Sequence, residues 1–112
     1  MEKFDVFVIG TGVAGTIIAN KSAKAGLKTG IVDNREYGGT CGLQGCIPKK
    51  ILVGATDGVA SSKNLEGKGV DNPPSINWKE LIDFKDSFTE PIPENKEAKF
   101  KENGISTYHG EP

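Results

Sequence analysis

The chain has 112 residues, a formal net charge of -1 and 36% hydrophobic residues. This length suits one small domain, and the near-neutral charge argues against nucleic acid or an anionic membrane as a partner. Because no cationic leader opens the sequence and no apolar stretch is long enough to cross a bilayer, we expect a cytoplasmic protein. In that compartment a single cysteine pair points to catalysis or regulation, since cytosolic thiols are kept reduced.

The first third of the chain has the pattern of a βαβ unit. Residues 4–9 are mostly apolar and run into glycine, as expected of a strand buried on both faces of a parallel sheet. Residues 13–25 predict a helix that stops at Gly26. The large apolar residues Val13, Ile17 and Ile18 are on one side of this helix. Small residues permit its close approach to a neighbour: Ala14, Gly15 and Ala19. Residues 27–32 predict a second strand, parallel to the first after a right-handed crossover.

The remainder is predicted to be mainly helical. Residues 51–62 predict a helix weakened by glycine, and residues 64–75 predict an exposed and mobile connection. Residues 76–103 have large apolar residues at helical spacing and are expected to break near Pro91. These apolar residues are Trp78, Leu81, Ile82, Phe84 and Phe88. We expect the aromatic ones to belong to the core rather than to a platform for stacking bases. Residues 105–109 predict a last short strand.

Residues 10–15, Gly-Thr-Gly-Val-Ala-Gly, fit the glycine fingerprint of dinucleotide-binding folds and lie between a predicted strand and a predicted helix. Gly10 permits a tight turn, Gly12 lets the backbone approach a pyrophosphate, and Gly15 lets the helix pack on the strand. The phosphates are expected to meet the unpaired amides at the helix start, including those of Val13 and Ala14. The alternative is an ordinary glycine-rich turn.

Asp33 ends the second predicted strand, at the offset of about 20 residues where a carboxylate binds an adenosine ribose. It therefore strengthens the dinucleotide interpretation. The alternative is a surface turn residue at the start of a charged cluster, Asn34, Arg35 and Glu36. Arg35 alone does not make a site for a 2′-phosphate.

Both cysteines, Cys41 and Cys46, lie in a segment rich in glycine and lysine. On a regular helix their Cα atoms would be roughly 7.5 Å apart along the axis, which exceeds the limit of about 7 Å for a disulfide. A bridge therefore requires a distorted helix start. Gly42 and Gly45 reduce the steric cost of that distortion, and Pro48 removes a backbone donor from the following turn.

We interpret the cysteine pair as a redox-active disulfide. The charges of Lys49 and Lys50 favour the thiolate, which is the form that attacks disulfides. The alternatives are two buried, inert thiols or half of a zinc site. Zinc is disfavoured because a site needs four ligands and the only histidine, His109, is distant in sequence.

The phosphate loop, the ribose carboxylate and the Gly-Gly-Thr-Cys segment follow one another in an order that resembles the N-terminal part of the flavoprotein disulfide reductases. This family includes glutathione reductase, lipoamide dehydrogenase, trypanothione reductase and mercuric reductase. The resemblance is specific over residues 4–52 and looser over residues 76–112. It implies an α/β, Rossmann-like FAD-binding fold of three layers, of which residues 1–112 are the N-terminal part, with nicotinamide-binding and dimerisation domains outside this chain.

The resemblance also implies roles for individual residues. Cys46 would be the thiol nearest the flavin, and Cys41 the thiol that attacks the substrate. A lysine after the second cysteine contacts the flavin near N5 in this family, so Lys49 and Lys50 are both candidates and Lys50 is preferred as the catalytic one. The implied cofactor-binding residues are Gly10, Gly12, Val13, Ala14, Gly15, Asp33, Gly39, Thr40, Lys49, Lys50 and Gly110, the last at the adenine end of FAD.

Two departures from the family bear on the subfamily and the activity. Gly42 replaces a usual aliphatic residue, and the two consecutive lysines favour the glutathione or mercuric reductase pattern over lipoamide dehydrogenase. The acid-base histidine of the family lies in its C-terminal domain, and His109 cannot be assumed to replace it. We therefore expect this chain alone to be inactive.

The function implied is electron transfer from NAD(P)H through FAD and the Cys41–Cys46 disulfide to a small disulfide or a metal ion. The complete protein is expected to be a homodimer that holds no metal cofactor and binds neither nucleic acid nor membrane. One alternative is a free-standing flavin-binding or dithiol redox module without nicotinamide chemistry. Another is a regulatory dithiol switch without flavin.

Overall fold

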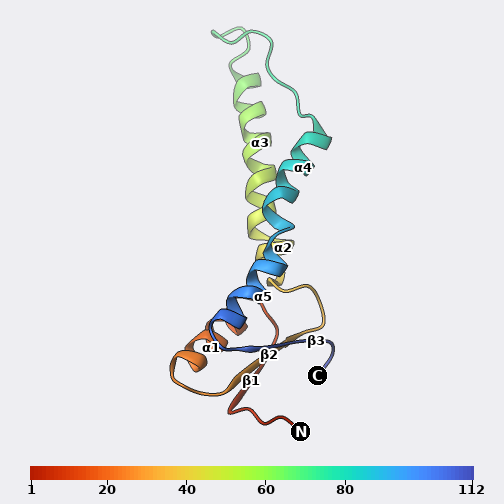
Figure 1. Ribbon diagram of the computed structural model, residues 1–112. Coiled ribbons are helices and arrows are strands. Elements are labelled where there is room, and N and C mark those ends of the chain that lie inside the picture. The colour runs from red at the N-terminus through yellow and green to blue at the C-terminus, as the bar shows by residue number, and fades with distance from the viewer.

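A three-stranded parallel sheet in the order β1-β2-β3 forms the base of the structure, a computed structural model that describes residues 1–112 (Figure 1). The strands are β1 (Val6–Ile9), β2 (Thr29–Asp33) and β3 (Ser106–His109). The helices are α1 (Val13–Lys24), α2 (Gly39–Leu43), α3 (Cys46–Asn64), α4 (Trp78–Thr89) and α5 (Ile92–Glu102). This arrangement confirms the predicted α/β class and the parallel βαβ unit.

The predicted burial of β1 on both faces is wrong. Phe7 is 44% exposed and Ile9 is 67% exposed, because β1 is an edge strand of the sheet. The central strand β2 is the one buried on both faces, with residues 29–32 all buried. A continuous apolar run therefore identified a strand correctly but did not show its place in the sheet.

The close approach of α1 that its small residues predict is confirmed at Gly15 and Ala19. Val13, Ile17 and Ile18 are 63%, 49% and 51% exposed, whereas Ala19 is completely buried. The helix lies very close to the strand, since a Cβ added at Gly15 would be 2.0 Å from the Gly10 oxygen. Only small side chains fit at that separation, so the large aliphatic residues face away.

The core lies between the sheet and two helices, α1 and α5. Its buried members are Val8, Ala19, Ile31, Tyr37, Phe100 and Ile105. Because residues paired across parallel strands point to the same side, Val8, Ile31 and Thr107 share this face of the sheet. The opposite face carries a cluster of aromatic rings, Phe4, Phe7 and Tyr108, with centroids 5.3 to 5.9 Å apart. Of the three layers expected, this chain thus forms two.

Helices α3 and α4 form an antiparallel arm that projects from the sheet and makes the molecule 69 Å long (Figure 1). Helix α3 begins at Cys46, five residues earlier than predicted. The exposed connection lies at the tip of the arm, and its mobility stays a prediction. The expected break is confirmed, because α4 ends at Thr89 and α5 begins at Ile92. No helix combines the length and the apolar character needed to cross a membrane.

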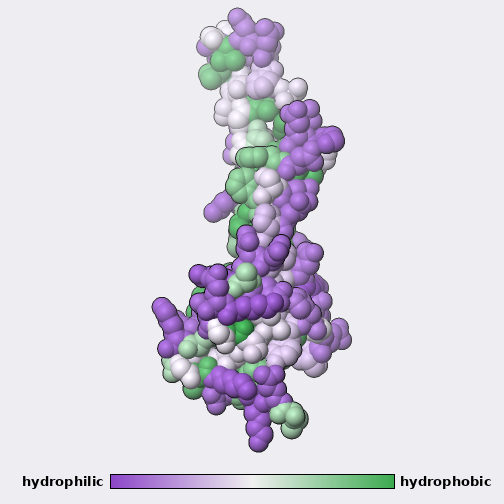
Figure 2. Space-filling view, viewed as in Figure 1, coloured by the Kyte–Doolittle hydropathy of each residue, from purple (hydrophilic) through white to green (hydrophobic).

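The prediction that the aromatic residues of α4 belong to the core is wrong. Trp78, Phe84 and Phe88 are 63%, 56% and 50% exposed, and hydrophobic residues are visible along the arm in Figure 2. Leu81 and Ile82 are half-buried. The reason is that a two-helix arm offers α4 a single helical neighbour, so the far side of α4 has nothing to pack against.

Replacement of Gly15 tests the close contact of α1 with the loop that precedes it. We expect Gly15→Ala to lower the free energy of unfolding by about 3 kcal/mol, because the new Cβ would overlap backbone atoms that cannot move aside easily. Gly54→Ala is the matched control, since it adds the same methyl group to α3 with no atom within 4 Å. This change should stabilise the chain by about 0.5 to 1 kcal/mol. Equal effects in urea unfolding would contradict the packing described here.

Candidate functional site

The glycine loop after β1 presents open backbone donors at the start of α1. Gly10 turns the chain with a φ of 99°, and its amide donates to the Val32 oxygen at 2.7 Å. Gly12 is the N-cap of α1, and no side chain caps the helix. The amides of the first turn, including those of the exposed residues Val13 and Ala14, therefore have no acceptor within the helix. Such a helix start suits an anion.

Gly12 lies beside space that the protein itself does not fill. Its φ of -70° is ordinary for any residue, and an added Cβ would have only one neighbour, the Gly39 Cα atom at 4.0 Å. The fold therefore does not require glycine at this position. A ligand that approaches the backbone closely would require it, as the dinucleotide fingerprint predicts.

Asp33 lies at the carboxyl end of β2 and is held by donors on both oxygens. Its Oδ2 accepts from the Thr11 amide at 2.8 Å and the Thr11 hydroxyl at 2.6 Å, and its Oδ1 accepts from the Arg35 amide at 3.0 Å. Burial acts to raise the pKa of this carboxyl. The hydrogen bonds from the Thr11 hydroxyl and from the amides of Arg35, Thr11 and Asn34 outweigh burial, so the pKa is below its ordinary value.

A cavity of about 290 Å³ connects the glycine loop with Asp33 and the start of the cysteine segment. It opens at the carboxyl ends of β1 and β2, where ligands bind in folds of this type. Its lining residues are Gly10, Thr11, Gly12, Asp33, Asn34, Arg35, Glu36, Gly39, Thr40, Leu43 and Gln44. Five of the predicted cofactor-binding residues are thus brought together in one pocket.

The cysteine segment packs directly against the glycine loop. Gly39 has a φ of 72°, and a Cβ added there would lie 2.4 Å from the Gly12 Cα atom. The amide of Gly38 donates to the Thr11 hydroxyl at 3.1 Å. The wall of the pocket therefore continues without a gap into α2, the helix that carries the first cysteine.

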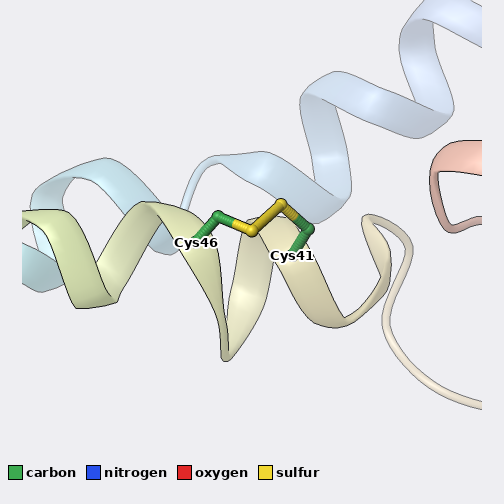
Figure 3. Close-up of a disulfide and its surroundings, with 2 residues drawn as sticks. All are labelled: Cys41 and Cys46. Carbon is green, nitrogen blue, oxygen red and sulfur yellow. A yellow bond between two sulfur atoms is a disulfide. The ribbon is translucent and has the colours of Figure 1, made fainter.

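A disulfide joins Cys41 in α2 to Cys46, the first residue of α3 (Figure 3). The two Cα atoms are 4.7 Å apart, because the chain leaves the helical path between Leu43 and Cys46. The predicted distortion of the helix start is confirmed. Gly45 makes it possible, since a Cβ there would lie 3.0 Å from the Thr40 oxygen and 3.3 Å from the Cys41 Cα atom.

The remaining predicted residues lie at the borders of the pocket. Lys49 and Lys50 are exposed and follow Cys46 by three and four residues, so both are on its side of α3. The Gly110 amide donates to the backbone carbonyl oxygen of Asp33 at 3.0 Å, which places the end of β3 beside the end of β2. His109 is 3.1 Å from a Glu97 oxygen. No group of three or more His, Cys, Asp or Glu side chains is arranged to hold a metal ion.

Two residues important for the site were not predicted. Thr11 holds Asp33, and Tyr37 joins β2 to β3 through a hydroxyl that donates to the Tyr108 oxygen at 2.6 Å and accepts from its amide at 3.0 Å. The sequence contains a weak signal for each. Thr11 is the one polar side chain in the glycine run, and Tyr37 is the one large ring in a polar stretch, residues 33–40.

The lowered pKa of Asp33 predicts a pH dependence of stability. The stabilisation from its carboxylate is complete above the ordinary pKa of aspartic acid and is lost as the pH falls through the lower native pKa. We expect Asp33→Asn to cost about 1 kcal/mol at neutral pH, the low end for bonds to a charged group because Asp33 is only partly buried. Unfolding in urea across the acid range should show this difference shrinking. A constant difference would contradict the lowered pKa.

A family model described as pyridine nucleotide-disulphide oxidoreductase matches residues 4–111 of the chain. The dihydrolipoyl dehydrogenase of Chlamydia muridarum is 36% identical over 110 residues, which are 97% of this chain and 24% of that relative. The dihydrolipoyl dehydrogenase of Thermus scotoductus is 34% identical over 98% of this chain and 24% of its own length. Dihydrolipoyl dehydrogenase 2 of Haloarcula marismortui is 32% identical over 95% of this chain and 22% of its own.

The chain thus spans about a quarter of the length of these curated relatives. Their names differ from the glutathione and mercuric reductases that the two lysines suggested. The family match covers nearly all of the sequence, including the glycine loop, Asp33 and both cysteines. The chain belongs to the pyridine nucleotide-disulphide oxidoreductase family.

Proposed function

We propose that this chain is the FAD-binding and disulfide-bearing part of an NAD(P)H-dependent disulfide reductase. The observation that carries the proposal is the contact of Gly12 with Gly39, which sets the anion-binding loop against the segment that holds the disulfide. A dinucleotide bound along the pocket would run from Asp33 past the glycine loop toward the cysteines. This proposal includes residues 1–112 as the N-terminal part of an FAD-binding domain.

The residues present fit FAD in three ways. The first turn of α1 offers free amides to a pyrophosphate, Gly12 leaves room for it, and ionised Asp33 can accept from a ribose hydroxyl. Bound there, FAD would supply the disulfide with an electron pair taken from NAD(P)H. Thr40 lines the same pocket, and Gly110 lies beside Asp33 where the adenine end is proposed to rest.

The two cysteines are proposed to have different tasks. Two electrons and two protons convert the disulfide into two thiols. Cys46 begins a helix of 19 residues, so the positive end of the helix dipole and the charges of Lys49 and Lys50 favour its thiolate. A stabilised thiolate suits the position next to the flavin. Cys41 is then the thiol that meets the substrate.

The exchange with substrate balances without further reactants. The Cys41 thiolate attacks one sulfur of a small disulfide, the substrate S–S bond breaks, and the other half leaves and takes a proton from solvent. Cys46 then attacks the Cys41 sulfur, which restores the Cys41–Cys46 bond and releases the second half as a thiol. Because the relatives are dihydrolipoyl dehydrogenases, a lipoyl disulfide is the first substrate to test. Its two sulfurs belong to one molecule, so both halves would leave together as one dithiol when the Cys41–Cys46 bond forms again. Homodimerisation and a cytoplasmic location are part of the same proposal.

Gly12→Ala tests the cofactor site. We expect FAD affinity to fall at least about tenfold, since the new methyl group would occupy the space proposed for the pyrophosphate. Thermal unfolding without FAD should be unchanged, because the methyl group has no close protein neighbour. The change in flavin fluorescence on binding measures the affinity, and Gly54→Ala serves as the matched control. If Gly12→Ala binds FAD as tightly as the unchanged protein, the proposed pocket is wrong.

Selective replacement of the cysteines tests their order. Reduction of the FAD-loaded protein by a dithiol under anaerobic conditions should produce a long-wavelength absorption band from a thiolate beside the flavin. We expect the band to be lost in Cys46→Ser and kept in Cys41→Ser, because only Cys46 is proposed to face the flavin. The reverse pattern would exchange the two roles. Absence of the band from all three proteins would contradict a disulfide placed next to FAD.

A further inference from the structure

The hydroxyl of Thr11 is the meeting point of three parts of the site. Thr11 is completely buried, with 0% of its surface exposed. Its hydroxyl donates to Asp33 Oδ2 at 2.6 Å and accepts from the Gly38 amide at 3.1 Å. Its own amide donates to the same Oδ2 at 2.8 Å. One residue therefore connects the glycine loop, the carboxylate and the N-cap of α2.

The hydroxyl is not needed to fill space. Valine has nearly the same shape, but it would leave the Gly38 amide without its acceptor and Asp33 without one of its donors. The Gly38 amide precedes α2 and lies three residues before Cys41. The three groups form a chain of two hydrogen bonds that polarise one another, from the Gly38 amide through the Thr11 hydroxyl to the charged carboxylate.

The contacts of Asp33 determine which acceptor positions of its carboxylate are left for a ligand. A carboxylate offers about four acceptor positions, two on each oxygen. Thr11 occupies both positions of Oδ2, and the Arg35 amide occupies one of Oδ1. The Asn34 amide also contributes a hydrogen bond to this carboxyl. Because Thr11 fills Oδ2, any room for a ligand hydroxyl is on Oδ1.

We propose that Thr11 is a positioning residue. It fixes Asp33 so that Oδ1 faces a ribose hydroxyl, and it connects this carboxylate to the start of the disulfide-bearing segment. The identity of the ribose rests on the proposed function, whereas the tie from Asp33 through Thr11 to Gly38 does not. Protonation of Asp33 should consequently change the surroundings of the Gly38 amide, although Gly38 makes no hydrogen bond to Asp33.

Nuclear magnetic resonance of the ligand-free chain tests this tie directly. The carboxyl carbon of Asp33 and the amide of Gly38 are followed as the pH is lowered. Other titratable or charged groups around Asp33 are Arg35 and Glu36 in its own loop, Tyr37, Glu97 on α5 and His109 on β3. The Asp33 carbon gives its own midpoint, so a Gly38 change caused by another group is recognised by a different midpoint.

We expect the Gly38 amide resonance to shift with the same midpoint pH as the Asp33 carboxyl carbon, both in the unchanged chain and in Thr11→Ser, which keeps the hydroxyl. In Thr11→Val the Gly38 response should be lost, the Asp33 midpoint should move to higher pH, and exchange of the Gly38 amide with solvent should become at least about tenfold faster. Thr56→Val is the matched control, because it removes a hydroxyl bonded to Val53 on the distant arm. It should leave Asp33 and Gly38 unchanged.

The outcomes separate this proposal from the proposed function. The positioning role is contradicted if the Gly38 amide resonance in the unchanged chain does not shift with the titration of Asp33. It is also contradicted if that resonance still shifts with Asp33 in Thr11→Val. If Thr11→Val does not fold, the unchanged chain and Thr11→Ser still decide the question through their shared midpoint. FAD affinity is measured separately and should fall about tenfold in Thr11→Val and persist in Thr11→Ser. Failure of the unchanged chain to bind FAD would contradict the proposed function. It would not contradict the connection from Asp33 through Thr11 to Gly38.

Discussion

The close approach of two backbones, at Gly12 and Gly39, is the constraint on which the rest of the site depends. No side chain fits between them at Gly39, where a Cβ would lie 2.4 Å from the Gly12 Cα atom. The contact sets α2 at a fixed position relative to the start of α1. The disulfide then joins α2 to the first residue of α3, so this junction is also linked to the base of the arm. The hydrogen bond from the Gly38 amide to the Thr11 hydroxyl joins the same two segments one residue earlier in each.

The parts of the site that the sequence predicted are those in which near neighbours in the chain impose the geometry. The glycine at position 15 must lie against the turn that precedes it, and the strand, turn and helix follow from that short stretch. The bridge between Cys41 and Cys46 is another case, since helix geometry alone required a break that the structure places between Leu43 and Cys46. The family resemblance added the order of these motifs, and the family match covers residues 4–111.

The parts that could not be predicted depend on neighbours distant in sequence. Hydrophobic spacing showed which residues of α1 and α4 favour burial, but Ile17 and Phe84 remain exposed because no element of the chain covers them. The role of Thr11 depends on Asp33, 22 residues away, and on Gly38, 27 residues away. Neither partner can be read from the glycine run itself. Tyr37 and Tyr108 are separated by 71 residues, so their bond follows only from the completed sheet.

The position of β1 at the border of the sheet has a further consequence for handling the protein. Its outer side carries backbone amides and carbonyls with no partner strand, next to the exposed ring of Phe7 and the half-buried ring of Phe4. A free strand border beside an apolar surface is a template for further strand addition. In concentrated solution the chains will therefore tend to associate through the edge strand β1. A charged residue in place of Ile9 would reduce this association.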